Sequence, residues 1–141
     1  MLGLHLTADL HGCRFERPAM TDPDALRVLC LTAVQRVGLQ AVGELFHSFA
    51  APAARSTEPL APAGVTGVVL LAESHLAVHT WPELDAVTLD VYVCNVGADN
   101  SPRAESLMTA MCAAFAPHCI ERQALRRGSL SKATPPRLSG E

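Results

Sequence analysis

The sequence predicts an α+β fold with a mostly antiparallel sheet and both helices on one face. Three observations support this class. Several segments alternate apolar and polar residues, as half-buried strands do. Two amphipathic segments with helix-start signals lie between those strands. The joins between successive strands are short, which favours antiparallel pairing. The 141 residues suffice for one domain with a substantial core.

The first half of the chain predicts a strand, a helix and a second strand. From Leu2 to Asp9, apolar residues alternate with polar ones, which is typical of a half-buried strand. Thr21-Asp22-Pro23-Asp24 combines a capping Asp with Pro and a second acid in the first turn, so a helix begins there. Gly38 ends that helix. Residues 39–49 predict the next strand, and the Ala- and Pro-rich residues 50–63 predict a loop.

The centre of the chain predicts further strands. Val65 to Ala72 is apolar almost throughout, as a buried strand would be. Residues 75–81 either continue that strand or return beside it. Residues 87–94 alternate valine and leucine with Thr88, Asp90, Tyr92 and Cys94, which predicts a strand with one polar face.

The last part predicts a helix, a strand and a tail. Ser101-Pro102 caps the helix, with Ser101 as the capping residue, and Pro117 lies just beyond its end. Residues 118–125 predict the final strand. Residues 129–141 show almost no apolar periodicity and predict a flexible tail after a single domain of residues 1–128. The apolar stripe that we expect this helix to bury comprises Leu107, Met108, Met111, Cys112 and Phe115.

One face of the predicted sheet lacks a cover within the chain. If both helices lie on one face, no third helix remains for the other. The composition is 49% hydrophobic and 18% charged, which leaves little polar cover. A partner subunit is the simplest way to bury the second face.

Composition also narrows the function classes. The net charge is −3 with no block of like charges, which argues against a nucleic-acid surface. The five cysteines are odd in number and lack paired C-x-x-C spacing, which argues against a disulfide framework or structural zinc site. The N-terminus has no basic region or long apolar run, and no stretch reaches membrane-spanning length. We expect a reduced protein in the cytoplasm.

Groups capable of catalysis gather directly after the buried strand that starts at Val65. A scaffold commonly presents its site at such a strand end. The groups in this segment are Glu73, Ser74, His75, His79 and Glu83.

Four interpretations of this segment remain open from the residues alone. It could be a strand with two tolerated histidines and a surface serine. A Ser/His hydrolase would need the missing Gly-x-Ser-x-Gly elbow, and a bend for Ser74 to meet His79. A metal site could use His75, His79 and either Cys94 or Glu83, although His-x-x-x-His is usually presented by a helix. In self-cleavage, a serine in a strained turn attacks the carbonyl of the preceding residue.

The residues from Gly64 to Glu83 closely resemble the core of the bacterial S-adenosylmethionine decarboxylase proenzymes. Glu-Ser-His followed by His-Thr-Trp-Pro-Glu at this spacing is a specific signal. The resemblance extends to His5-Leu6-x-x-Asp9-Leu10-x-Gly12-Cys13, to His47-x-Phe49 and to Asp90-Val91-Tyr92-Val93-Cys94. It covers roughly residues 2 to 128.

The resemblance implies that the protein cuts itself between Glu73 and Ser74, giving a beta chain of residues 1–73 and an alpha chain of residues 74–141. The Ser74 hydroxyl would attack the Glu73 carbonyl to form an ester. Elimination and hydrolysis with loss of ammonia would then leave a pyruvoyl group at position 74. His79 matches the family's histidine for this processing, and Thr66 matches a hydroxyl residue that assists it.

The resemblance also implies a catalytic cycle. The pyruvoyl group, as the cofactor, would form a Schiff base with the substrate's α-amine and accept electrons as carbon dioxide leaves. Cys94 matches the acid that returns a proton to the α-carbon. Phe49 matches an aromatic that stacks on adenine, and Glu83 matches an acid that binds the ribose hydroxyls. His5, His11 and Cys13 match motif positions without an assigned chemical role, and no metal is implied.

The implied fold is a two-layer sandwich whose sheet packs on that of a second subunit, giving an αββα homodimer of processed protomers. The implied activity supplies the aminopropyl donor for spermidine from S-adenosylmethionine. A pyruvoyl-dependent ornithine or arginine decarboxylase on the same fold is the main alternative, followed by a metal-dependent hydrolase and a non-catalytic dimeric binding module. Two departures from the family pattern are the long loop of residues 50–63 and Asn95, where a glycine is common.

Overall fold

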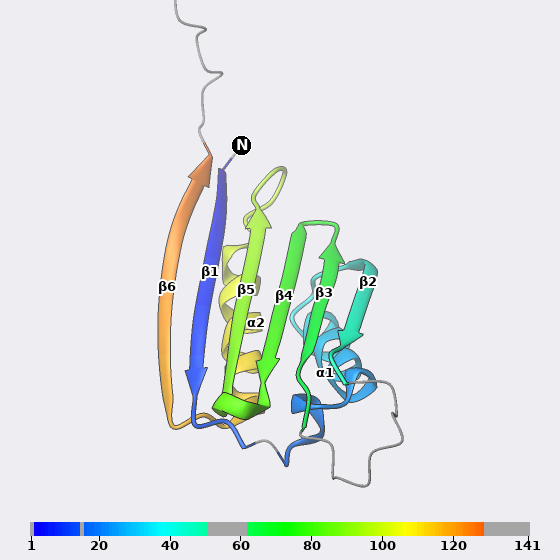
Figure 1. Cartoon of the computed structure of the whole chain (residues 1–141). Helices are drawn as coiled ribbons and strands as arrows, with labels where there is room; N and C mark the ends of the chain where they lie inside the picture. Colours follow the sequence, from blue (N-terminus) through cyan, green and yellow to red (C-terminus); the bar gives the residue numbers. More distant parts are fainter. Residues whose placement is uncertain (1, 15, 51–61, 129–141) are drawn as a thin grey trace, which may run out of the picture.

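The computed structural model describes residues 2–14, 16–50 and 62–128, which form one antiparallel sheet with two α-helices on one face (Figure 1). The strand order is β2-β3-β4-β5-β1-β6, and every neighbouring pair is antiparallel. This confirms the predicted α+β fold. The elements in chain order are β1 (Leu2–His11), η1 (Pro18–Met20), α1 (Pro23–Arg36), β2 (Ala41–Ser48), β3 (Val65–Leu71), β4 (Ser74–Trp81), η2 (Pro82–Leu84), β5 (Ala86–Cys94), α2 (Ser101–Phe115) and β6 (Cys119–Gly128).

The core lies between the sheet and the two helices. In Figure 1 both helices lie behind the sheet, with α1 against β2 and β3 and α2 against β5 and β1. The predicted stripe of α2 is fully or almost fully buried, with Phe115 and Leu107 at 0% exposure. Burying a large apolar side chain contributes about 1.5–3 kcal/mol, so this stripe holds α2 on the sheet.

The helix starts agree with the sequence for α1 and differ slightly for α2. The Asp22 side chain accepts a hydrogen bond of 2.9 Å from the Asp24 amide, as expected of an N-cap. For α2, the prediction that Ser101 caps the helix was wrong, because Ser101 is its first helical residue. Asp99 instead accepts from the Ser101 amide at 3.0 Å. The Asp99 carboxylate therefore caps the start of α2, in place of the Ser101 hydroxyl that the sequence predicted.

The strand boundaries shift by one to three residues. β3 ends at Leu71, one residue before the prediction, because Ala72 and Glu73 form the turn into β4. The open question about residues 75–81 is decided, since they return beside β3 as β4. The predicted loop lies mostly outside the described residues, which lack 51–61, and so does the predicted tail of residues 129–141.

The face of the sheet opposite the helices is not covered by any described element (Figure 1). The side chains of His5, Tyr92 and His75 lie on this face, because these three residues are register partners on adjacent strands β1, β5 and β4. Large apolar side chains on this face are exposed, including Leu45 at 70% and Leu70 at 52%. We call it the open face.

None of the helices within the described residues has the length and apolar character needed to cross a membrane. The cytoplasmic location expected from the sequence stays a prediction.

Candidate active site

Ser74 begins β4 directly after the Ala72-Glu73 turn, in a backbone conformation that is rare for residues other than glycine. Its φ angle is 153°. Such a conformation costs on the order of 1–3 kcal/mol and persists only where the surroundings impose it. Here the pairing of Ser74 with Leu71 on one side and with Val93 on the other imposes it. The strained turn that self-cleavage requires is therefore present at the expected serine.

The end of β5 reaches the same turn. The backbone amide of Cys94 donates a hydrogen bond of 2.8 Å to the carbonyl oxygen of Glu73. An amide that points at a carbonyl oxygen stabilises the negative charge that develops there under nucleophilic attack. The carbonyl next to Ser74 thus already has one donor of the kind found in oxyanion holes. Nothing in the sequence pattern indicates this contact, because it depends on how β5 ends beside the turn.

Glu73 is also fixed from the other side of the turn. Its carboxylate oxygen Oε2 accepts a hydrogen bond of 3.3 Å from the Gln40 amide, and the Ala72 amide donates to the Gln40 carbonyl at 2.8 Å. Gln40 lies in the loop between α1 and β2. These contacts hold Glu73 independently of its bond to Ser74.

Four of the sequence-predicted site residues meet at a second place. Thr66 on β3 and His79 on β4 are cross-strand partners, and Thr66 Oγ1 and His79 Nδ1 share a hydrogen bond of 3.1 Å. Together with Phe49 and Glu83 they line a pocket of about 230 Å³, which Gly64, Thr80 and Trp81 complete. We call this the His79 pocket.

Buried Thr80 fixes the wall of the His79 pocket. Its hydroxyl donates to the Met20 carbonyl at 2.7 Å and accepts from the Val65 amide at 2.8 Å. Gly64 is necessary for this approach, because a Cβ there would lie 2.1 Å from the Thr80 carbonyl oxygen. Sequence reasoning missed Thr80, although its place inside the His-Thr-Trp-Pro-Glu motif was a signal that it matters.

The aromatic residues of the His79 pocket are not core residues. Phe49 is 62% exposed and Trp81 is 43% exposed. Neither ring belongs to the hydrophobic core between the sheet and the helices. Exposed aromatic rings beside a pocket are available to stack on a planar ligand.

The two groups of candidate residues lie at opposite ends of the sheet. The turn into β4 and the end of β5 are at the upper end in Figure 1, and η2 with the end of β4 is at the lower end. His79 lies five positions after Ser74 along the extended strand β4, which corresponds to about 16 Å. The bend that would bring them together within one chain is absent.

The same strand geometry disfavours the metal alternative. His75 and His79 are about 13 Å apart along β4, because His79 lies four positions after His75 in an extended strand. Among the described residues, no three His, Cys, Asp or Glu side chains converge as a metal site would require.

Of the five cysteines, Cys94 alone lies at the turn. Burial raises the pKa of the Cys13 thiol to about 11 and that of Cys30 to about 12. Burial likewise raises the pKa of Cys112. These three thiols therefore stay protonated and pack in the core, as most buried cysteines do. Cys119 is exposed at the start of β6, where it pairs with His11 of β1 at the other end of the sheet.

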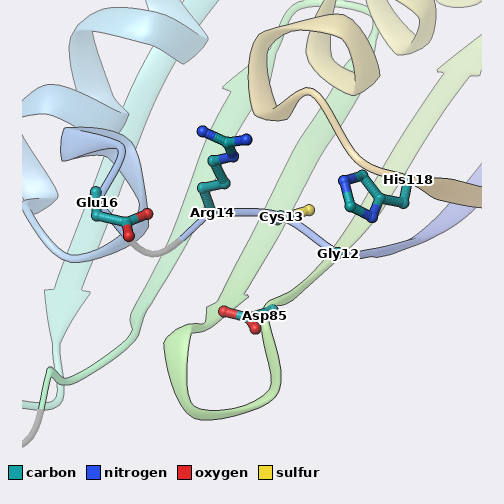
Figure 2. A pocket seen from close by; sticks show the side chains of 6 residues that line it. All are labelled: Gly12, Cys13, Arg14, Glu16, Asp85 and His118. Atoms are coloured by element: carbon teal, nitrogen blue, oxygen red, sulfur yellow. The ribbon is translucent and has the colours of Figure 1, made fainter.

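The His11-Gly12-Cys13 motif serves the fold at the corner after β1. Cys13 is completely buried, and its amide donates to the Asp85 carbonyl at 2.8 Å. Gly12 has a φ of 72°, and a Cβ there would lie 2.9 Å from the His118 side chain. Figure 2 shows these residues around a separate pocket of about 360 Å³. The motif thus connects the end of β1 to Asp85, which follows η2, and packs beside His118, which precedes β6.

Asn95 has a structural role that a glycine could not fill. Its side-chain oxygen accepts from the Asn100 amide at 2.9 Å, and its side-chain nitrogen donates to Ser101 Oγ at 2.9 Å. Asn95 therefore ties the loop after Cys94 to the start of α2. This departure from the family pattern supports the position of Cys94.

Comparisons with known proteins agree with this arrangement. The chain matches the S-adenosylmethionine decarboxylase family over residues 4–128. It is 34% identical over 129 residues to the S-adenosylmethionine decarboxylase proenzyme of Persephonella marina, covering 92% of this chain and 84% of that protein. It is 39% identical over 93 residues to the proenzyme of Syntrophomonas wolfei, covering 66% of this chain and 64% of that one.

A solved structure supports the same grouping. The crystal structure of the adenosylmethionine decarboxylase from Aquifex aeolicus has a TM-score of 0.76 to this chain at 32% sequence identity, covering 94% of this chain and 96% of that one. Sequence and fold agree over nearly the whole described chain, and the chain belongs to the S-adenosylmethionine decarboxylase family.

Proposed function

We propose that this protein is a self-cleaving decarboxylase of S-adenosylmethionine whose prosthetic group is a pyruvoyl made from Ser74. The observation that carries the proposal is the turn at Glu73, where a strained serine follows a carbonyl that the Cys94 amide polarises. The family supports the substrate, since its members in the comparisons are named S-adenosylmethionine decarboxylase proenzymes. The ornithine or arginine alternative has no such support.

Cleavage follows from the chemistry of the turn. The Ser74 hydroxyl attacks the Glu73 carbonyl carbon, and the Cys94 amide stabilises the charge on its oxygen. Collapse of the tetrahedral intermediate breaks the bond between the Glu73 carbonyl carbon and the Ser74 nitrogen. An ester then links Glu73 to the Ser74 side chain, and the Ser74 nitrogen becomes a free amine. Loss of the Ser74 α-proton expels the Glu73 carboxylate, and hydrolysis of the remaining dehydroalanine releases ammonia and leaves the pyruvoyl group.

Cys94, Phe49 and Glu83 have separate roles in the decarboxylation of the substrate. The pyruvoyl group would accept the electron pair that the α-carbon keeps as carbon dioxide leaves, in the way pyridoxal phosphate does. Cys94 donates a proton to the substrate α-carbon, which its place beside the turn allows. Phe49 stacks on adenine at the edge of the His79 pocket, and Glu83 accepts hydrogen bonds from the ribose hydroxyls. Ornithine and arginine carry neither group. The product would be an aminopropyl donor for spermidine synthesis.

The working site is composite, built by two copies of the chain, because the two halves of the site are too far apart within one copy. When two open faces pack together around a twofold axis, the Ser74 end of one sheet can meet the His79 end of the other. His79, hydrogen-bonded to Thr66, then acts as the processing base on the partner's Ser74. This αββα homodimer also buries the exposed leucines of the open face. Each copy contributes residues 1–128 as one domain.

Mass spectrometry of the intact purified protein under denaturing conditions tests this function. We expect two chains, residues 1–73 and a pyruvoyl-capped 74–141, the second lighter by one ammonia than a chain that starts with serine. Radiolabelled carbon dioxide should be released from carboxyl-labelled S-adenosylmethionine. A chain that stays full-length would contradict self-cleavage. Carbon dioxide from ornithine or arginine alone would contradict the substrate.

Replacing Cys94 with alanine should separate cleavage from turnover. Cleavage should persist because alanine keeps the backbone amide that donates to Glu73. Decarboxylation should fall by on the order of 10²-fold or more, since the proton donor is lost. Chain masses and kcat measure the two effects. Cys119→Ala, which removes an exposed thiol elsewhere, is the matched control. Normal turnover by the Cys94 variant would remove that thiol from the mechanism.

A further inference from the structure

Aromatic and charged side chains surround His75, the residue that directly follows Ser74. On the open face, His75, Tyr92 and His5 lie side by side on β4, β5 and β1, because they are register partners. The ring centroids of His75 and Tyr92 are 5.8 Å apart, those of His5 and Tyr92 are 5.7 Å apart, and those of His5 and His75 are 6.4 Å apart. We call this row with its two flanking residues the His75 cluster; its members are His5, His75, Asp90, Tyr92 and Arg127.

The flanking residues hold the row of rings in place. Asp90 Oδ1 lies 2.9 Å from His5 Nε2, so a charge-assisted hydrogen bond orients the His5 ring. The Arg127 guanidinium lies over the Tyr92 ring at 5.1 Å from its centroid, within cation–π distance. Gly3 leaves room for that ring, because a Cβ there would lie 2.8 Å from a Tyr92 ring carbon.

His75 enters this cluster as an uncharged ring. Burial lowers its pKa below the ordinary value, and the neighbouring His5 adds to the effect, while Asp90 opposes it. At neutral pH the imidazole is therefore neutral. A neutral His75 ring beside Tyr92 and His5 serves packing, and it repels neither His5 nor Arg127.

Cleavage creates a need for such a contact. Once the bond between Glu73 and Ser74 is cut, residue 74 becomes a chain end, and chain ends lose order unless something ties them down. Glu73 keeps its own hydrogen bonds to Gln40 and Cys94. Among the described residues of one copy, position 74 is held by the strand pairing of β4 and by the contacts of the residue next to it.

We propose that the His75 cluster holds the new chain end in place after cleavage, with His75 as a positioning residue for the reactive group at position 74. The proposal rests on the proposed function, because it concerns the chain end that self-cleavage produces. A reacting group that is displaced by about 1 Å can lose about 10²-fold in rate. A ring anchored on two neighbouring strands is a means of preventing this displacement.

Variants of His75 test the proposal. His75→Ala should still cleave but lose about tenfold or more in kcat, with KM changed much less, because the reactive group is misplaced while the binding residues remain. His75→Phe keeps a ring against Tyr92 and should restore most of the rate. Hydrogen exchange at residues 75–77 of the cleaved protein should quicken in the alanine variant and slow again in the phenylalanine variant. Arg122→Gln, which breaks an exposed ion pair with Glu105, is the control and should match wild type.

The outcomes separate this proposal from the proposed function. An uncleaved, inactive wild-type protein would contradict the function itself. A cleaved, active wild type with unchanged kcat in His75→Ala would overturn only the positioning role. Equal loss in the alanine and phenylalanine variants would overturn it as well, because packing of a ring would then not suffice. If His75→Ala fails to fold, Asp90→Asn tests the same cluster through His5, and an unchanged kcat there would overturn the proposal.

Discussion

Ser74→Ala is expected to abolish cleavage completely and to leave one chain of 141 residues without decarboxylase activity. The variant keeps the strained turn and the hydrogen bond from the Cys94 amide to Glu73, but it has no hydroxyl to attack the carbonyl. Without the ester no elimination can follow, so no pyruvoyl group forms. Intact mass after prolonged incubation measures the loss, and release of labelled carbon dioxide measures the activity.

A serine elsewhere provides the control for this result. Ser106 is exposed on α2, and Ser106→Ala should cleave and turn over like the wild type. Thermal unfolding should show that the Ser74 variant is folded. If Ser74→Ala were cut between residues 73 and 74 at the wild-type rate, another nucleophile would be responsible, and the assignment of Ser74 would be wrong.

Chains carrying Ser74→Ala and chains carrying His79→Ala should restore cleavage to each other when they are co-expressed. Alone, the first lacks the nucleophile, and the second should be cut on the order of 10²- to 10⁴-fold more slowly for want of a base. In a mixed dimer, one composite site combines Ser74 of the His79→Ala chain with His79 of the Ser74→Ala chain. That site has every wild-type group, whereas the other site lacks both.

Which of the two co-expressed variants is cleaved shows whether the base comes from the second copy. With tags of different mass on the two chains, only the His79→Ala chain should appear as fragments. Chains that carry both substitutions, co-expressed with His79→Ala chains, form no complete site and should stay uncut. Sedimentation should give the mass of two copies for the wild type. Failure of mixed dimers to cleave, or normal cleavage by His79→Ala alone, would exclude a base supplied by the second copy.

The local elements follow from the sequence because their determinants are local. Asp22 caps α1 by a contact with a residue two positions away, and the stripe of α2 repeats at helical spacing. The alternation in β1 and β5 assigns each residue to a face of the sheet. Element ends are less predictable, since the position where β3 ends depends on the turn at Ala72 and on its contact with Gln40, more than thirty residues away.

The candidate site was predictable in its residue types but not in its geometry. The motif at Ser74 and His79, through the family resemblance, names both residues, and the pairing of Thr66 with His79 brings a predicted partner to hydrogen-bonding distance. By contrast, the Cys94 amide at the Glu73 carbonyl and the contact of Asp90 with His5 join residues that have no periodic relation in the chain. Such contacts depend on strand order, which periodicity does not encode.

The sequence by itself determined the fold class, the serine at the turn and the residue types of the candidate site, because composition, periodicity and a short motif are properties of neighbouring residues. Only the tertiary structure decided that Ser74 and His79 lie toward opposite ends of one strand. It also decided that Cys94 lies beside the turn that contains Ser74. An extended strand keeps residues five apart at about 16 Å, while antiparallel pairing brings Cys94 within a hydrogen bond of Glu73, twenty-one residues earlier. The division of the site between two ends of the sheet is a consequence of that pairing.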